Sequence, residues 1–268
     1  MLLREIINSI ESVAPRSAQE QWDNSGMQVG DTGRDIRAVL LTTDVTPEVV
    51  DEAIMLGCNL ILSHHPLLFH GLKQVCGQTP QARIVEQAIK HDIAIYSAHT
   101  SLDSVIGGIN TRLADKLGLQ NYRILVPAAD GKTGLGVIGT LPKAVNYLDF
   151  IGQIRDILDC TYIRYTAPKS SITDYQSPIQ TVALCGGSGA EFIGEAIAQG
   201  ADVYLTADCK YHEFQDAAGR IGLIDIDHWY SERHARDIFK DILAPLGIPC
   251  YISKTDKTPI QLWQKQKN

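Results

Sequence analysis

The six cysteines of this 268-residue chain form neither a C-x-x-C pair nor a regular framework. They stand far apart, at Cys58, Cys76, Cys160, Cys185, Cys209 and Cys250. Zinc knuckles need closely spaced cysteine pairs, and disulfide-bonded scaffolds need many cysteines in a short chain. The pattern excludes both classes and favours a reducing compartment, so we expect a cytoplasmic protein.

Long apolar runs and basic runs are also missing. No stretch approaches the roughly 20 apolar residues that cross a bilayer. The apolar spacing over residues 2–13 predicts an amphipathic helix, not the apolar centre of a signal peptide. The formal charge of −7 disfavours nucleic-acid binding, which depends on clustered Lys and Arg. We therefore expect neither a membrane nor a nucleic acid as partner.

Two segments of the chain, beginning at Ala38 and at Thr181, align with each other without a gap. Each segment predicts an apolar strand, a polar turn, a helix that stops at a glycine (Gly57 or Gly200), and a second apolar strand. Strand–helix–strand patterns are common, so a chance match is the alternative. The gapless identities favour an internal duplication.

This alternation predicts an α/β fold of two similar α/β halves, with mostly parallel sheets flanked by helices. We expect residues 1–125 to form the first half, completed by the C-terminal segment 234–268, and residues 126–233 to form the second. Ligands of such sheets gather at the carboxyl ends of the strands. A site is therefore expected there, between the two halves.

Histidines and carboxylates follow three of the expected strands. The side chains are His64 and His65, His99 with Asp103, and His228 with Glu232. Imidazole nitrogens and carboxylate oxygens are ligands for divalent transition metals. Six candidates are too many for one tetrahedral ion, but they suit two ions that share a carboxylate.

Each pair also has an ordinary explanation. His64 and His65 can be turn residues, Asp103 can cap a helix, and His228 with Glu232 can be a surface pair on one helix. An acid stands four residues after a histidine in both repeats, and this recurrence favours metal binding. His234, two residues past Glu232, is expected on the surface.

Two loops of the second repeat have less decisive patterns. Gly186–Gly189 follows a strand but matches neither the Rossmann nor the Walker pattern, so it predicts phosphate binding only weakly. Asp208 and His212 occupy the place that corresponds to His64 and His65. They can line the same cavity or lie on the surface.

Six motifs, spread over nearly the whole chain, carry a family resemblance. They are Trp22-Asp-Asn-Ser-Gly26, Ser63-His-His-Pro66, His99-Thr-Ser-Leu-Asp103, Cys185-Gly-Gly-Ser-Gly189, Thr206-Ala-Asp-Cys-Lys-Tyr-His212 and His228-x-x-Ser-Glu232. With them the chain resembles the dinuclear-metal-centre family whose members are called GTP cyclohydrolase 1 type 2 homologs. The resemblance implies a homohexameric ring. It also implies a ligand set of His64, His65, Asp103, His228 and Glu232, with Glu232 as the bridge and His99 as a neighbour.

Two classes of function fit these patterns. The first is a metal-dependent hydrolase with two divalent ions (zinc, manganese, iron or nickel) that acts on an unidentified small molecule. In it Asp44, His99 or His212 would carry protons. The second is a non-catalytic metal-binding, metal-insertion or regulatory protein. We favour the hydrolase, because about five ligands for two ions leave coordination positions open.

Overall fold

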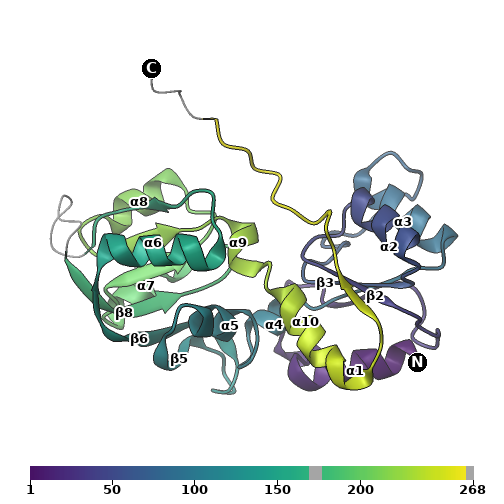
Figure 1. Ribbon diagram of the computed structural model, residues 1–268, viewed down its shortest axis with the longest axis horizontal. Helices are drawn as coiled ribbons and strands as arrows, with labels where there is room; N and C mark the ends of the chain where they lie inside the picture. The colour runs from purple at the N-terminus through teal and green to yellow at the C-terminus, as the bar shows by residue number, and fades with distance from the viewer. Residues whose placement is uncertain (169–176, 264–268) are drawn as a thin grey trace.

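The chain folds into two lobes, each built around one β-sheet, as the computed structural model shows (Figure 1). The structure describes residues 1–168 and 177–263. The last five positions of the predicted C-terminal segment, 264–268, lie outside the described residues. The expected α/β class with two sheets flanked by helices is confirmed.

The first sheet is mostly parallel, as expected. Its order is β1-β4-β3-β2-β11; β1 pairs antiparallel with β4, and the other neighbours are parallel. The strands are β1 (Gly26–Val29), β2 (Val39–Thr42), β3 (Leu60–Ser63), β4 (Ala94–Ser97) and β11 (Cys250–Ile252). Every residue of β2, β3 and β4 is buried, because helices cover both faces of the sheet.

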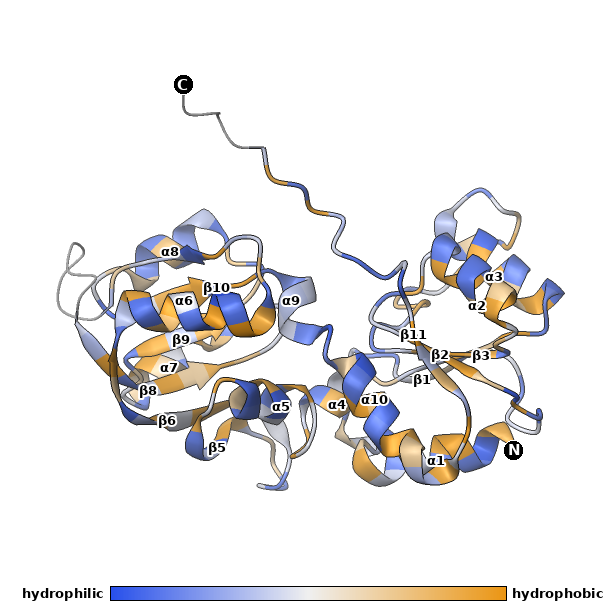
Figure 2. Cartoon of the chain, viewed as in Figure 1, coloured by the Kyte–Doolittle hydropathy of each residue, from blue (hydrophilic) through white to orange (hydrophobic). Residues whose placement is uncertain are grey.

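Two helix pairs make those covers. Helices α1 (Leu3–Val13) and α10 (Ala235–Leu243) pack against the face that carries Val39 and Leu41. Helices α2 (Pro47–Leu56) and α3 (Pro80–Lys90) pack against the opposite face, which carries Leu40. Successive strand residues point to opposite faces of the sheet, so one apolar strand contributes side chains to two hydrophobic cores. Figure 2 shows the resulting pattern, with hydrophobic strands inside and hydrophilic helix faces outside.

The second sheet corrects the expectation of mostly parallel strands. Its order is β5-β6-β8-β9-β10-β7, and only β8, β9 and β10 run parallel to one another. The strands are β5 (Gln120–Pro127), β6 (Gly134–Asn146), β7 (Arg164–Tyr165), β8 (Pro178–Leu184), β9 (Val203–Thr206) and β10 (Gly222–Asp225). Strands β5 and β6 are joined by a short turn, which permits only antiparallel pairing. The short strand β7 adds another antiparallel edge, on β10.

Helices also cover both faces of this second sheet. Helices α5 (Ile109–Lys116) and α6 (Tyr147–Leu158) share one core with Val182 and Leu205, while α7 (Ile193–Ala198) and α8 (Tyr211–Ala217) share another with Ala183 and Tyr204. The two aligned sequence segments thus form β2–α2–β3 in one lobe and β8–α7–β9 in the other. The internal duplication itself stays a prediction.

Two short helices begin just beyond the carboxyl ends of strands. Helix α4 (Thr100–Asp103) follows β4, and α9 (His228–Glu232) follows β10. The remaining helical turns are the 3-10 segments η1 (Arg16–Ala18), η2 (Ala190–Phe192) and η3 (Ala244–Leu246). None of the helices in the described ranges is both long and apolar enough to span a membrane.

Candidate metal centre

The turn after β3 and the two short helices α4 and α9 bring histidines and carboxylates of both lobes together. Their candidate ligand atoms form three overlapping groups, each with all atoms within 4.8 Å of one another. The groups are His64, His65 and His99; His65, His228 and Glu232; and His64, Asp103 and Glu232. All six side chains singled out from the sequence therefore meet in one place.

Glu232 lies at the centre of this cluster. Its Oε2 atom is 2.8 Å from His65 Nε2, 2.8 Å from His228 Nε2 and 3.7 Å from His64 Nε2. Glu232 is buried, and it belongs to two of the three groups. A carboxylate in this position lies within reach of a cation held by any of these three histidines.

The Nδ1 atoms of the central histidines are held by partners outside the cluster. His65 Nδ1–H donates to Asp44 at 2.8 Å, and His228 Nδ1–H donates to Asp208 at 2.7 Å. His64 Nδ1–H donates to the Ala98 carbonyl at 2.9 Å. A proton fixed on Nδ1 leaves the Nε2 lone pair free to bind a metal. The Nε2 atoms of His65 and His228 lie 3.2 Å apart, so a single cation would accept the lone pairs of both nitrogens.

Two buried atoms of the cluster have no hydrogen-bond partner within the described part of the chain: His64 Nε2 and Asp103 Oδ1. They lie 3.6 Å from each other. Buried polar atoms are almost always hydrogen-bonded, because leaving one unpaired costs roughly 1–3 kcal/mol. Both orphaned atoms are metal-ligand types, so this donor set fits a divalent cation.

The cluster is also rich in negative charge. Burial and the neighbouring Glu232 carboxylate raise the pKa of Asp103 to about 8. Burial alone would lower the pKa of His65, but Asp44 and Glu232 outweigh it and raise that pKa to about 10. Burial opposes the same effect at His228, where Glu232 and Asp208 raise the pKa to about 11. The site therefore attracts cations, and a metal ion would have to compete with protons there.

The glycine-rich loop after β8 supports Glu232 directly. Gly187 has a φ of +65°, and a Cβ atom at this position would lie 2.2 Å from Glu232 Oε1. Its N–H donates to Ser231 Oγ at 2.9 Å. Only glycine leaves room for the carboxylate. The loop that the sequence related weakly to phosphate thus packs against the histidine–carboxylate cluster.

Asp23 is a residue of this site that the sequence reasoning missed. It accepts hydrogen bonds from His99 Nδ1–H at 2.7 Å, from the Thr100 N–H at 3.0 Å and from Ser25 Oγ at 2.9 Å. Burial opposes ionisation, but the hydrogen bonds from His99 and Thr100 hold the pKa of Asp23 well below its usual range. The signal for its role was its place beside Trp22 in a recognisable motif.

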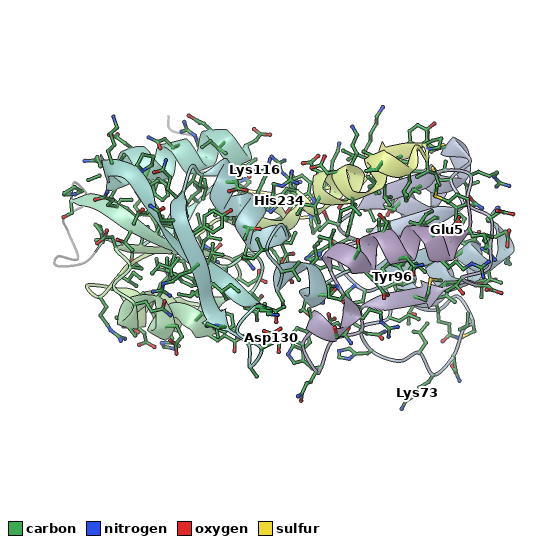
Figure 3. All side chains as sticks on the ribbon, turned by 90° about the horizontal axis from the view of Figure 1, so that it is seen from below. Glu5, Lys73, Tyr96, Lys116, Asp130 and His234 are labelled. Atoms are coloured by element: carbon green, nitrogen blue, oxygen red, sulfur yellow. The ribbon has the colours of Figure 1, made fainter. Side chains whose placement is uncertain are left out.

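Two other histidines lie away from the predicted arrangement. His212 is exposed on α8, where its ring contacts Gln215 Oε1 at 3.4 Å, and the structure does not bring it to the cluster. His234, expected on the surface, is 3% exposed and lies at the junction of the lobes (Figure 3). Helix α9 ends at Glu232, so helical spacing does not predict the direction of the His234 side chain. The Nε2–H of His234 donates to the Ile109 carbonyl at 3.1 Å.

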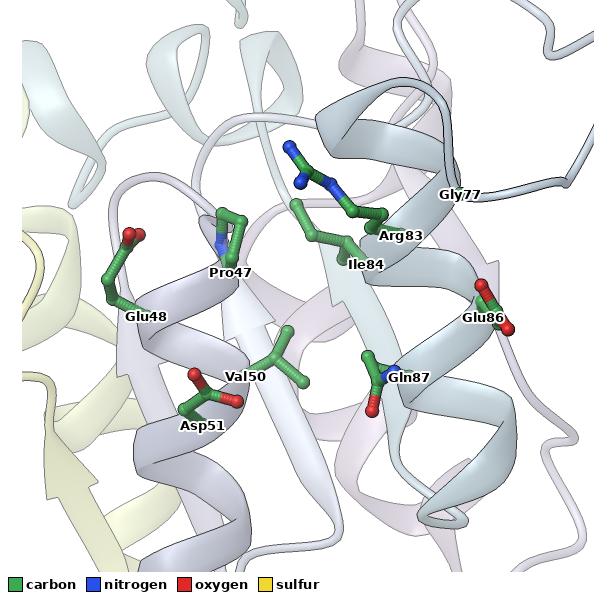
Figure 4. Close-up of a pocket in the computed structure, with 9 residues that line it drawn as sticks. All are labelled: Pro47, Glu48, Val50, Asp51, Gly77, Arg83, Ile84, Glu86 and Gln87. Atoms are coloured by element: carbon green, nitrogen blue, oxygen red, sulfur yellow. The ribbon is translucent and has the colours of Figure 1, made fainter.

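Two hollows differ in their relation to this cluster. One of about 500 Å³ lies between α2 and α3, with Val50 and Ile84 among its lining residues (Figure 4). None of its lining residues belongs to the cluster. A smaller cavity of about 230 Å³ is lined by Asp103, His228 and Glu232 themselves. The histidine–carboxylate cluster is therefore accessible from the smaller cavity.

Two helix-flanked sheets with a partly buried histidine–carboxylate cluster between them define an α/β protein able to hold metal ions. The sequence pattern of the family Duf34/NIF3 (NGG1p interacting factor 3) matches residues 1–259. The chain belongs to this family, which confirms the resemblance found in the sequence motifs.

Relatives and solved structures agree with this assignment. A GTP cyclohydrolase 1 type 2 homolog of Clostridium perfringens is 38% identical over 234 residues, covering 87% of each chain. A homolog of the same name from a Nostoc species is 36% identical over 254 residues, covering 92% of this chain and 93% of that one. The crystal structure of a Bacillus cereus protein related to NIF3 superposes with a TM-score of 0.88 at 26% identity, covering 98% of this chain and 99% of that one.

Proposed function

We propose that this protein holds two divalent metal ions and uses them to hydrolyse a small molecule. One ion would be held by His65, His228 and Glu232, and the other by His64, Asp103 and Glu232. The pair of orphaned buried atoms, His64 Nε2 and Asp103 Oδ1, is the observation that carries this proposal. Histidine–carboxylate sites accept zinc, manganese, iron or nickel, and all four belong in the test.

Three protein ligands per ion leave coordination positions open, which is typical of catalytic rather than structural sites. When bound, two such ions lower the pKa of a water molecule and polarise a carbonyl, imine or phosphoryl group. Hydrolysis adds one water across the bond that breaks. The water oxygen bonds to the electrophilic carbon or phosphorus, and a proton goes to the leaving atom.

His99 is the side chain best placed to move that proton. Asp23 fixes its Nδ1–H, so its Nε2 is the free nitrogen, and His99 lines the same cavity as the ligands Asp103 and Glu232. Asp44 acts differently, because its hydrogen bond to His65 makes it a positioning residue for a ligand. His212 lies outside the cavity, and we assign it no role in the reaction.

The decisive experiment combines metal analysis with a substrate screen. Purified protein, His65→Ala and Glu232→Ala are analysed for bound metal, with His212→Ala as an exposed-histidine control. We expect about two ions per chain in the parent and the control, and fewer in the two cluster variants. Absence of metal, or equal stoichiometry in all variants, would overturn the metal centre.

The screen then measures metal-dependent turnover of nucleotides, cyclic amides and phosphoesters. GTP is included because the relatives are named as homologs of a GTP cyclohydrolase. Turnover that is lost on chelation and restored by metal supports the hydrolase. A fully metal-loaded protein that turns over no substrate would instead support the alternative of a non-catalytic metal-binding, metal-insertion or regulatory protein.

We also propose that the protein acts as a homohexamer, as the family resemblance implies. Large apolar side chains stand exposed on the outer helices, including Met55 at 77% and Ile89 at 64%. Exposed apolar surface on neighbouring elements is typical of contact surfaces between subunits.

A further inference from the structure

The cavity beside the metal cluster has aromatic walls. Trp22 and Phe69 from the first lobe and Phe192 from the second line the same 230 Å³ space as Asp103 and Glu232. A ligand in this cavity would therefore touch aromatic rings and the candidate metal ligands at the same time. Neither the ligand set nor the proton transfer at His99 explains why aromatic side chains gather there.

The rings of Trp22 and Phe69 are exposed in spite of their size. Trp22 is 60% exposed and Phe69 is 43% exposed, and their centroids lie 5.8 Å apart with the ring planes tilted by 58°. Trp22 also lies 6.1 Å from the His99 ring. Aromatic rings attract other rings in offset or edge-to-face arrangements at these distances. Their exposed surfaces offer such contacts to a ligand.

Hydrogen bonds hold the two loops that carry these rings together. Asn24 Nδ2–H donates to the Leu68 carbonyl at 2.8 Å, and the Leu68 N–H donates to Gln28 Oε1 at 3.1 Å. Asn24 stands two residues after Trp22, and Leu68 directly precedes Phe69. The rings are thus positioned before any ligand arrives, which lowers the entropic cost of binding.

The charges of the cavity define the ligand further. No lysine or arginine is among its lining residues in the described part of the chain, whereas Glu191, Asp103 and Glu232 line it. Asp103 and Glu232 are candidate metal ligands, so Glu191 is the carboxylate left to accept hydrogen bonds from N–H donors of a ligand and to disfavour an anionic group beside it. The volume of about 230 Å³ lies below the roughly 300–1,000 Å³ of sites for drug-sized ligands, so it suits a compact molecule.

We infer that this cavity binds an uncharged planar ring with N–H donors, of one or two fused cycles, against Trp22 and Phe69. The inference rests on the proposed function, because it names the substrate class that the same site would take. The ring stacks on the aromatic wall, and its edge faces the metal cluster.

Three probes test the inference on the zinc-loaded protein. Carbostyril is a neutral fused-ring lactam with one N–H, its fully hydrogenated form keeps the lactam but loses the planar ring, and naphthalenesulfonate keeps the rings but adds an anion. Ligand-observed NMR and tryptophan fluorescence measure binding. We expect carbostyril to bind more tightly than either of the other two. Equal or tighter binding of the saturated or the anionic probe would overturn the inference.

Variants locate the binding. Trp22→Ala and Phe69→Ala should each weaken carbostyril binding by roughly 10- to 100-fold, the effect of removing one stacking ring. Trp263→Ala is the matched control, because Trp263 is 89% exposed and does not line the cavity. Equal affinity of Trp22→Ala and Trp263→Ala would contradict the aromatic site. Thermal unfolding checks that all variants are folded.

Failure of this inference and failure of the proposed function have different signatures. Ring binding that depends on Trp22, in a protein that turns over no substrate, would sustain the cavity assignment and refute the hydrolase. Metal-dependent turnover that is unchanged by Trp22→Ala and Phe69→Ala would sustain the hydrolase and refute the aromatic site.

Discussion

Replacing Gly187 by alanine tests whether the glycine loop holds Glu232 in place. The added Cβ atom would lie 2.2 Å from Glu232 Oε1, whereas real Cβ contacts are essentially never under 3.0 Å. The carboxylate or the loop must therefore move by about 0.8 Å, the difference of these two distances. Glu232 is buried, so this displacement cannot be absorbed by a swing into solvent.

The expected effect of Gly187→Ala has two separable parts, one on the free energy of unfolding and one on metal affinity. A left-handed backbone with a Cβ atom costs about 1–2 kcal/mol, and Gly187→Ala should lose this much stability from its φ of +65°. Gly200→Ala carries the same backbone cost at a φ of +78° but has no atom within 4 Å of its Cβ. Metal ligands tolerate shifts of only about 0.2 Å, so Gly187→Ala should also lose roughly 10- to 100-fold in metal affinity.

Urea denaturation of the metal-free proteins and chelator competition of the metal-loaded proteins measure the two parts. We expect both variants to be destabilised, and only Gly187→Ala to bind metal more weakly. If Gly187→Ala and Gly200→Ala compete with the chelator equally well, Glu232 does not depend on this loop, and the argument for a preformed bridging carboxylate is refuted.

Three further predictions follow from other contacts. Burial opposes ionisation of Glu52, but hydrogen bonds from Ser253 and the backbone N–H groups of residues 254 and 255 lower its pKa, so its contribution to stability is present above pH 4.5 and lost as the pH falls. Glu52→Gln should therefore cost roughly 1–3 kcal/mol in urea denaturation at pH 7 and less at pH 3, and a cost that does not change with pH would contradict this. Burial, helped by Lys116, lowers the pKa of His234 to about 4. Because the unfolded state then binds the proton more tightly, the parent should lose up to about 3 kcal/mol between pH 6.5 and pH 4 relative to His234→Gln in metal-free denaturation, and parallel pH profiles would count against it. Light scattering should give a mass of six times the 29.4 kDa chain, and a monomer at micromolar concentration would refute the hexamer.

The extent of successful prediction differs between the two sheets. Buried strands such as β2 and β3 are continuous apolar runs, so their type, their helix partners and their parallel pairing follow from local patterns. The second sheet is mixed because β6 runs antiparallel to both β5 and β8, and the edge strand β7 runs antiparallel to β10. The pairing of an added strand depends on which strand edge is still unpaired in the folded chain. The local hydrophobic pattern of the sequence does not encode this pairing.

Roles that depend on contacts between distant residues were the hardest to predict. Asp23 binds His99 across 76 positions of the chain, and Asp208 binds His228 across 20. The sequence around an aspartate in a loop does not show which distant residue the aspartate will contact. The surface assignment of His234 was wrong for a related reason, because the end of α9 and the packing of the lobes decide its burial.

The sequence by itself determined the family, the α/β class and the residue types that gather at the strand ends, because these depend on short periods and on motif spacing. The tertiary structure alone decided that Glu232 lies among three histidines, that their Nδ1 atoms are held from outside, and that two ligand atoms stay unpaired. It also decided that Trp22 and Phe192 line one cavity. These relations arise only when the two lobes pack together, because no single segment of the chain carries all the residues that form the site.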